Sequence, residues 1–294
     1  MIKKGLFGLA SFFLYLLSLL PFRLLYILSD ILFLIIYYVI KYRRKVVQCN
    51  LENAFPEKSI IERAIIEKKY FQYLSDMVVE CIKMLSISKS TLKKRLRIKN
   101  IEEVTRHLNE GKSILMATGH YGNWEWGPLM MALAVPEQVI VIYKPLTNKN
   151  FELLINRMRS RFGTMMVSMK QTLRKIIEMK NTVTITVFAN DQTPAKIDSH
   201  YVLKFLNQPT SVFPGIEKVA HMTNNPVLFC YIDRLKRGYY EGTFKTIVEQ
   251  PSLHKEEEIT KLHTQELENI IIRKPELWLW SHRRWKYKQE DLTS

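Results

Sequence analysis

A histidine and a glutamate five positions apart are the side chains best suited to chemistry in this chain. His120 and Glu125 lie in the segment Thr118-Gly119-His120-Tyr121-Gly122-Asn123-Trp124-Glu125, directly after the apolar run 113–117. On a single α-helix, five positions would turn the two side chains about 140° apart. They can meet only if His120 lies in a loop and Glu125 points back from the first turn of the next helix.

Such a pair can act as a general base with an orienting carboxylate. The carboxylate holds the imidazole in one tautomer and stabilises the imidazolium that forms when the base takes a proton. Acyl-transfer sites use this pairing to activate a nucleophile. A histidine and a glutamate at this spacing also recur by chance as unrelated surface residues, so the neighbouring elements have to decide between the two interpretations.

The neighbouring pattern places the pair at the carboxyl end of a buried strand. The apolar run 113–117 predicts a strand, and the glycines at 119 and 122 permit a tight loop after it. A helix is predicted from Trp124. Open α/β sheets carry their active sites where a strand ends and a helix begins, so the position favours a functional role for His120.

Alternating apolar segments predict an α/β fold with a mostly parallel central sheet flanked by helices. The predicted strands are 113–118, 138–143, 164–168, 182–188, 202–206, 227–233 and 243–248. The predicted helices of this part are 124–134, 148–162, 170–180, 211–223 and 256–273.

Polar residues follow two of these strands. Lys144 comes after the strand 138–143, and Asp191 and Gln192 come after the strand 182–188. The carboxyl ends of parallel strands meet at one edge of a sheet, so these side chains are expected near His120. There they would line the same crevice as His120. The alternative is an ordinary turn capped by Asn190 and Asp191.

Arg159 and Arg161 lie at the end of the predicted helix 148–162. Guanidinium groups match phosphate oxygens in two-point hydrogen bonds, so both arginines are candidates, with Lys144, for binding phosphate groups near the end of the sheet that carries His120. A solvated helix face is the alternative.

The first 45 residues predict a membrane anchor. Two apolar runs, Gly5–Leu20 and Leu24–Ile40, are separated by Pro21-Phe22-Arg23. Each run is slightly shorter than the roughly 20 residues that a spanning helix needs, and basic residues flank both ends, which favours the cytoplasmic side for both. A hairpin, or one tilted span with a second interfacial helix, is predicted. A cleaved signal peptide and a soluble helix pair are the alternatives. Residues 46–294 are predicted to form one domain.

The composition predicts an anionic partner. The 294 residues include 44 Lys and Arg against 28 Asp and Glu, a net charge of +16. Nucleic acid, a membrane surface and an acidic protein all fit this charge, and the apolar N-terminus favours lipid over nucleic acid.

The three cysteines are widely separated and give neither metal-ligand spacing nor a disulfide framework. Near the C-terminus, Trp278, Trp280 and Trp285 alternate with cations, a pattern typical of an interfacial belt or a stacking patch.

An ordered set of motifs resembles the lipid A late acyltransferase family, the lauroyl and myristoyl transferases of lipid A biosynthesis. The motifs are Arg43-Arg44-Lys45-Val46-Val47, Asn50-Leu51, Ala54-Phe55-Pro56-Glu57, the segment 118–125, Tyr143-Lys144-Pro145-Leu146, Arg161-Phe162-Gly163, Asp191-Gln192 and Trp280-Ser281-His282-Arg283-Arg284-Trp285-Lys286. The resemblance runs from the apolar N-terminus to the final Trp-Lys. The family usually has arginine where Lys144 stands.

The resemblance implies a glycerolipid acyltransferase-like fold and a set of site residues. His120 and Glu125 would be catalytic, and the substrate-binding residues would be Asn123, Lys144, Arg159, Arg161, Asp191 and Gln192. The acyl donor would be acyl carrier protein or acyl-CoA, and the acceptor a hydroxyl of a lipid A precursor or related glycolipid. No metal or other cofactor and no nucleic acid is expected. The implied location is the inner membrane of a Gram-negative-type bacterium, with the catalytic domain on the cytoplasmic side.

We expect His120 to take the acceptor proton while Glu125 orients it, in a direct transfer without an acyl-enzyme. Backbone N–H groups of the 119–123 loop, or a nearby cation, could stabilise the oxyanion. One rival interpretation is a membrane-bound, metal-dependent lipid phosphohydrolase that uses His120, Asp191 and His200. The other is a non-catalytic lipid- or nucleic-acid-binding protein.

Overall fold

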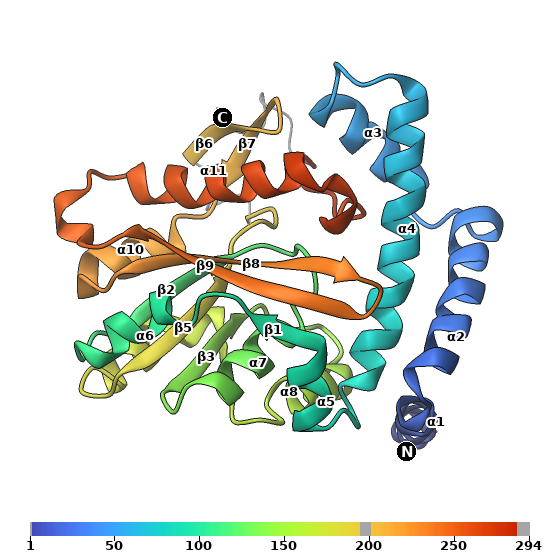
Figure 1. Ribbon diagram of the computed structural model, residues 1–294, viewed down its shortest axis with the longest axis horizontal. Coiled ribbons are helices and arrows are strands. Elements are labelled where there is room, and N and C mark those ends of the chain that lie inside the picture. The colour runs from blue at the N-terminus through green and yellow to red at the C-terminus, as the bar shows by residue number, and fades with distance from the viewer. Residues whose placement is uncertain (1, 195–200, 287–294) are drawn as a thin grey trace.

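A seven-stranded sheet forms the centre of the computed structural model, which describes residues 2–194 and 201–286 (Figure 1). The strand order is β1-β9-β8-β2-β5-β3-β4. Only β8 and β9 are antiparallel neighbours; the other neighbouring pairs are parallel. The strands are β1 (Leu96–Ile98), β2 (Ile114–Thr118), β3 (Gln138–Tyr143), β4 (Met165–Ser168), β5 (Thr184–Ala189), β8 (Val227–Lys236) and β9 (Tyr239–Val248). The predicted α/β class with a mostly parallel sheet is confirmed.

Helices cover both faces of the sheet because β2 is apolar on both sides. Leu115 and Ala117 pack in a core with α10 and α11, whereas Ile114 and Met116 pack with α6 and α7. Successive side chains of a strand point to opposite faces, so a continuous apolar run belongs in the middle of the sheet. The helices of this part are α5 (Lys89–Arg95), α6 (Glu102–Asn109), α7 (Trp126–Ala134), α8 (Lys149–Arg159), α9 (Thr172–Glu178), α10 (Gly215–Thr223) and α11 (Glu258–Arg273).

Three predicted elements differ from the structure. The strand predicted at 202–206 does not join the main sheet: β6 (Tyr201–Phe205) pairs with β7 (Gln208–Val212) in a separate antiparallel hairpin. The helix predicted from 211 begins at Gly215, because β7 extends to Val212. The final strand begins at Tyr239 rather than 243 and forms a tight hairpin with β8, in which Gly238 takes a φ of 73°.

Four helices make up the N-terminal part. They are α1 (Ile2–Leu19), α2 (Phe22–Leu34), which continues as a π-helical segment η1 (Ile35–Val39), α3 (Arg44–Ala54) and α4 (Ile60–Lys83). Ser59 and Glu62 form a capping box that fixes the start of α4. In Figure 1, α2 runs alongside α4 at the edge of the molecule. Within the described residues, Phe22–Val39 is the one stretch whose length and apolar composition suit a membrane crossing.

The two faces of α2 differ in chemistry. Toward α4, Ser29 Oγ donates a hydrogen bond of 2.6 Å to Asp76, and Tyr26 Oη donates one of 2.8 Å to Glu80. The outer face exposes large apolar side chains: Leu24, Ile27, Leu28, Ile31 and Leu34. A docked helix with an exposed apolar face is suited to contact lipid on that face alone.

Candidate active site

The register of two adjacent strands brings His120 and Asp191 together. β2 and β5 run parallel with Thr118 opposite Ala189, so the chain reaches His120 and Asp191 two residues beyond that pair on each strand. His120 Nδ1 lies 2.6 Å from Asp191 Oδ1, and the backbone N–H of His120 donates to Oδ2 at 2.7 Å. The carboxylate therefore fixes both the ring and the backbone of His120.

Asp191 is held as a buried carboxylate. Trp278 Nε1 donates a third hydrogen bond to it, at 2.8 Å. Burial alone would raise the pKa of Asp191, but the positive charge of His120 and the donated hydrogen bonds outweigh burial and lower that pKa to about 2. Asp191 is thus ionised at neutral pH and can balance an imidazolium.

The other nitrogen of His120 faces outward. Its Nε2 lies 3.2 Å from Gln192 Nε2, its ring meets Trp124 edge-to-face at 5.3 Å, and 19% of the side chain is exposed. Burial works against a charged imidazole, yet the attraction and hydrogen bond of Asp191 prevail, so the pKa of His120 is raised above its ordinary value. With Nδ1–H donating to Asp191, Nε2 carries the lone pair that can accept a proton from a substrate.

Glu125 does not orient His120 as predicted. It lies just before α7 and binds Arg159 of α8, accepting from Nε at 2.7 Å and from Nη2 at 2.5 Å. A guanidinium fork offers two charged donors to one carboxylate, and Asp191 already occupies Nδ1 of His120. Burial opposes ionisation of Glu125, but the Arg159 hydrogen bonds and charge lower its pKa. Glu125 acts on His120 through its charge, not through a hydrogen bond.

The predicted phosphate-binding cations are not gathered in one place. Arg159 is paired with Glu125 near His120, and Arg161 donates to the carbonyl of Met84 at the end of α4. A helix C-terminus carries partial negative charge and unpaired carbonyls, which explains why Arg161 turns there. Lys144 is exposed, directly after β3. The positive charge of Arg159 works to lower the pKa of His120, against the effect of Asp191.

Asn123 is fully buried and cannot contact a substrate from its present position, contrary to the prediction. Its Nδ2 donates to Glu80 at 2.6 Å, and its Oδ1 accepts from the backbone N–H of Trp126 at 3.1 Å. Asparagine is a favoured helix cap because its side chain satisfies a free N–H of the first turn. Asn123 therefore positions the start of α7 and the loop before it.

Backbone N–H groups of the loop are also engaged within the protein. The N–H of His120 binds Asp191, and that of Gly122 binds the carbonyl of Leu277 at 3.0 Å. The prediction that the loop amides form an oxyanion hole therefore fails for these two groups.

Gly122 has a φ of 59°, and a Cβ there would lie 1.6 Å from the carbonyl oxygen of Ile232. Only glycine fits this position.

The C-terminal tryptophans support the site from inside. Trp278 and Trp280 are buried, so the prediction of an interfacial belt is wrong for both. Tyr121 and Trp278 form an isolated antiparallel bridge, and the N–H of Leu279 donates to the carbonyl of His120 at 3.1 Å. The sequence offered no sign that the indole N–H of Trp278 binds Asp191. Aromatic bodies with one polar handle are well suited to such buried supporting roles.

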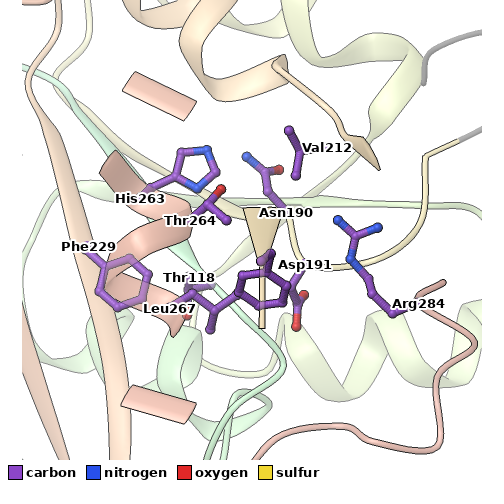
Figure 2. Close-up of a pocket in the computed structure, with 10 residues that line it drawn as sticks. Thr118, Asn190, Asp191, Val212, Phe229, His263, Thr264, Leu267 and Arg284 are labelled. Atoms are coloured by element: carbon purple, nitrogen blue, oxygen red, sulfur yellow. The ribbon is translucent and has the colours of Figure 1, made fainter. Parts of the chain in front are cut away.

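Behind Asp191 lies a small cavity of about 10 Å³ (Figure 2). Thr118, Asn190, His263 and Arg284 are among the residues that line it. This volume suits one water molecule and is far too small for an acyl chain. Burial lowers the pKa of Arg284 to about 10 and that of His263 to about 4. The cavity thus lies among the buried residues around Asp191, and its lining is partly polar and partly apolar.

Comparison with known proteins decides the family. The sequence model described as bacterial lipid A biosynthesis acyltransferase matches residues 1–287. The chain belongs to this family. It is therefore an acyltransferase, and the family implies an acceptor of the lipid A type, which confirms the resemblance seen in the sequence.

Named relatives are distant but span most of the chain. The lipid A biosynthesis palmitoleoyltransferase of Escherichia coli K12 is 23% identical over 249 residues, which is 84% of this chain and 80% of the relative. The lauroyltransferase of the same organism is 23% identical over 259 residues, 86% and 82% of the two chains. A lipid A biosynthesis acyltransferase of Haemophilus influenzae is 23% identical over 279 residues, 92% and 85%.

Proposed function

We propose that this acyltransferase moves a fatty acyl group from acyl carrier protein, or from acyl-CoA, to a hydroxyl of a lipid A precursor or related glycolipid. One observation carries the proposal: His120 is fixed through Nδ1 by an ionised carboxylate while Nε2 faces outward beside Gln192. This is the arrangement of a general base for a hydroxyl nucleophile.

In the proposed step, Nε2 of His120 takes the proton of the acceptor hydroxyl as its oxygen attacks the thioester carbonyl. The new C–O bond forms, the C–S bond breaks, and the imidazolium returns the proton to the leaving thiolate. Asp191 stabilises the imidazolium by charge and by the bond to Nδ1. No protein nucleophile takes part, so the transfer is direct.

Glu125 and Arg159 form the second proposed functional pair. Arg159 binds Glu125 through Nε and Nη2, and we assign its remaining N–H groups to the developing oxyanion or to an acceptor phosphate. Glu125 would hold that guanidinium in place and add negative charge near the imidazolium. Lys144 and Gln192, both exposed, are assigned to substrate contact at the same edge.

Substitutions at His120 and Glu125 test the mechanism. His120→Ala should lower turnover by about 10²-fold or more, the usual scale for losing general acid–base catalysis. Glu125→Ala should lower turnover by about 10²-fold as well, because Arg159 loses the carboxylate that holds it toward the oxyanion or phosphate. Release of free thiol from the donor, together with the mass of the acylated acceptor, would be measured on detergent-purified enzyme. If both variants transfer at the wild-type rate, the mechanism is wrong.

We further propose that residues 1–45 form the membrane anchor and residues 46–294 the catalytic domain at the cytoplasmic face of the inner membrane. The polar face of α2 binds Asp76 and Glu80 of α4. A spanning α2 in this docked position would bring these carboxylates into the hydrocarbon layer, at high cost. If α2 instead lies in the plane of the membrane surface, that cost is avoided, and the outer apolar side chains of α2 can contact lipid. The net charge of +16 suits both an anionic membrane surface and an acidic carrier protein.

The family assignment argues against a metal-dependent phosphohydrolase and against a nucleic-acid-binding protein. For the former, His120 Nδ1 and both oxygens of Asp191 are already used in mutual hydrogen bonds, and His200 lies outside the described residues. We expect a chelator to leave acyl transfer intact. An activity that is lost on chelation and restored by zinc would favour the metal mechanism instead.

A further inference from the structure

Glu80 of α4 is a fully buried acidic residue that no step of the proposed mechanism uses. Its carboxylate accepts three side-chain hydrogen bonds: from Tyr26 at 2.8 Å, from Asn123 at 2.6 Å and from Tyr240 at 2.7 Å. Burial raises the pKa of Glu80 to about 7, against the lowering effect of the tyrosine hydrogen bonds. A buried carboxylate is costly, and an apolar side chain is often the more stable choice at such a position.

One of these bonds reaches the loop that carries His120. Asn123 lies between His120 and Glu125 in the sequence, is fully buried, and caps the backbone N–H of Trp126. Trp126 Nε1 also donates to the backbone carbonyl of Glu80 at 3.3 Å. Glu80 therefore holds the loop end and the first residue of α7 together.

A second residue of α4 binds the same loop at Gly122, the residue before Asn123. The hydroxyl of Tyr73 donates to the carbonyl of Gly122. Tyr73 and Glu80 are seven positions apart, close to two helical turns, so they share one face of α4. This face of α4 and the Leu277–Leu279 segment together fix the loop from two sides.

Another bond of Glu80 reaches the N-terminal apolar helix. Tyr26 belongs to α2, and one turn farther along, Ser29 binds Asp76, one turn from Glu80 on α4. Arg237, at the tip of the β8–β9 hairpin, bridges Asp30 of α2 at 2.6 Å and Asp76 at 2.7 Å. The docking of α2 thus depends on polar contacts that include the carboxylate holding Asn123.

We propose that Glu80 is a positioning residue that couples the docking of α2 to the geometry of the His120 loop. When α2 is docked, Tyr26 completes the hydrogen bonds of Glu80, and Glu80 holds Asn123 and the loop in the arrangement that presents His120 to substrate. When α2 leaves, Glu80 loses one donor and gains water, and its hold on Asn123 weakens. The inference rests on the proposed role of His120 as the base.

The test compares Glu80→Ala, Glu80→Gln and Tyr26→Phe in the full-length, detergent-purified enzyme. We expect Glu80→Ala to lower kcat by about 10-fold or more with little change in KM for the acyl donor, because the loop acts on the chemical step. Glu80→Gln should keep most activity, since an amide oxygen can still accept from Asn123 and Tyr240. Tyr26→Phe should lower kcat by about 3-fold or more. The double variant Tyr26→Phe/Glu80→Ala should have the same kcat as Glu80→Ala alone.

Tyr38→Phe is the matched control, because Tyr38 is half exposed in the η1 segment that follows α2. It should leave kcat unchanged. Hydrogen exchange of amides 119–126 gives a readout that needs no catalysis: exchange should be faster in Tyr26→Phe and Glu80→Ala than in the wild type and in Tyr38→Phe.

These results separate the inference from the proposed function. A wild-type enzyme that transfers no acyl group overturns the function, while faster exchange in the variants would still support the coupling. Unchanged exchange and unchanged kcat in Tyr26→Phe overturn the coupling, even where Glu80→Ala fails to fold. Strictly additive effects of Tyr26→Phe and Glu80→Ala also overturn it.

Discussion

His120 is hydrogen-bonded to Asp191, which follows the neighbouring strand β5, whereas Glu125 of its own loop is hydrogen-bonded to Arg159. The difference matters for catalysis because the group on Nδ1 decides which nitrogen carries the lone pair and how strongly the proton is held. Asp191, with a pKa of about 2, remains negative over the whole working range of an imidazole base. The two acidic residues therefore take separate roles, Asp191 on the base and Glu125 on Arg159.

Asp191→Asn tests the first role. We expect kcat to fall by about 10²- to 10⁴-fold, because the amide no longer stabilises the imidazolium. The raised pKa of His120 depends on the charge of Asp191, so this pKa should fall in the variant. Because the base works when neutral, the acidic limb of the kcat/KM profile should move to lower pH.

Asp233→Asn is a matched control for this profile. Asp233 accepts from the hydroxyl of Tyr121 at 3.1 Å, in the same loop, without a hydrogen bond to His120. The acidic limb of the kcat/KM profile of Asp233→Asn should stay at the wild-type pH. An Asp191→Asn enzyme whose acidic limb is also unmoved would show that Asp191 does not set the pKa of the base.

The sequence predicted the residue types of the site better than their contacts. His120, Asp191 and Gln192 were expected at one sheet edge because each follows a strand. Which of them touch depends on β2 and β5 being direct neighbours in register, and the order of strands cannot be read from local periodicity. The Glu125–Arg159 pair likewise depends on how α7 and α8 pack.

The loop between β2 and α7 is held rigidly at both ends. Gly122 is its tightest point, since a side chain there would overlap the backbone of β8. Gly122→Ala should therefore lower the free energy of unfolding by more than about 3 kcal/mol, combining left-handed strain with a backbone clash. Thermal and denaturant unfolding would measure the loss.

Gly111→Ala separates strain from clash. Gly111 also has a positive φ, 74°, but a Cβ there meets nothing within 4 Å. Gly111→Ala should therefore lower the free energy of unfolding only by the cost of a left-handed conformation for alanine, about 1–2 kcal/mol. Equal losses in the two variants would mean that the contact with Ile232 has little effect. The sequence predicted this loop from its glycines, but the clash partner lies on a strand more than a hundred positions away and could not be predicted.

The whole molecule combines an α/β domain with an apolar N-terminal pair of helices. The sequence predicted both parts, since each has a strong hydrophobic pattern. It did not predict that α2 docks on α4 through Tyr26 and Ser29, because these polar residues are scattered in an otherwise apolar run. Proposed membrane contact is thereby limited to the outer face of α2 and to α1.

Ile27→Asp combined with Ile31→Asp tests that contact. Both side chains are about half exposed on the outer face of α2. We expect the double variant to bind anionic vesicles at least about 10-fold more weakly, because two apolar contacts become charges that lipid rejects. Leu253→Asp, an equally apolar exposed position in η4 (Pro251–Leu253), should bind like the wild type. Vesicle flotation would measure binding, and equal flotation of all three proteins would contradict an α2 contact.

Mass spectrometry of lipid extracts tests the central claim most directly. Cells that lack the protein would be supplied with either the wild-type chain or His120→Ala at matched expression. The account predicts a lipid A-type species heavier by one acyl chain with the wild type, and its absence with His120→Ala. The same mass gain with both proteins would contradict His120 as the base, and no gain with the wild type would contradict acyl transfer to this class of acceptor.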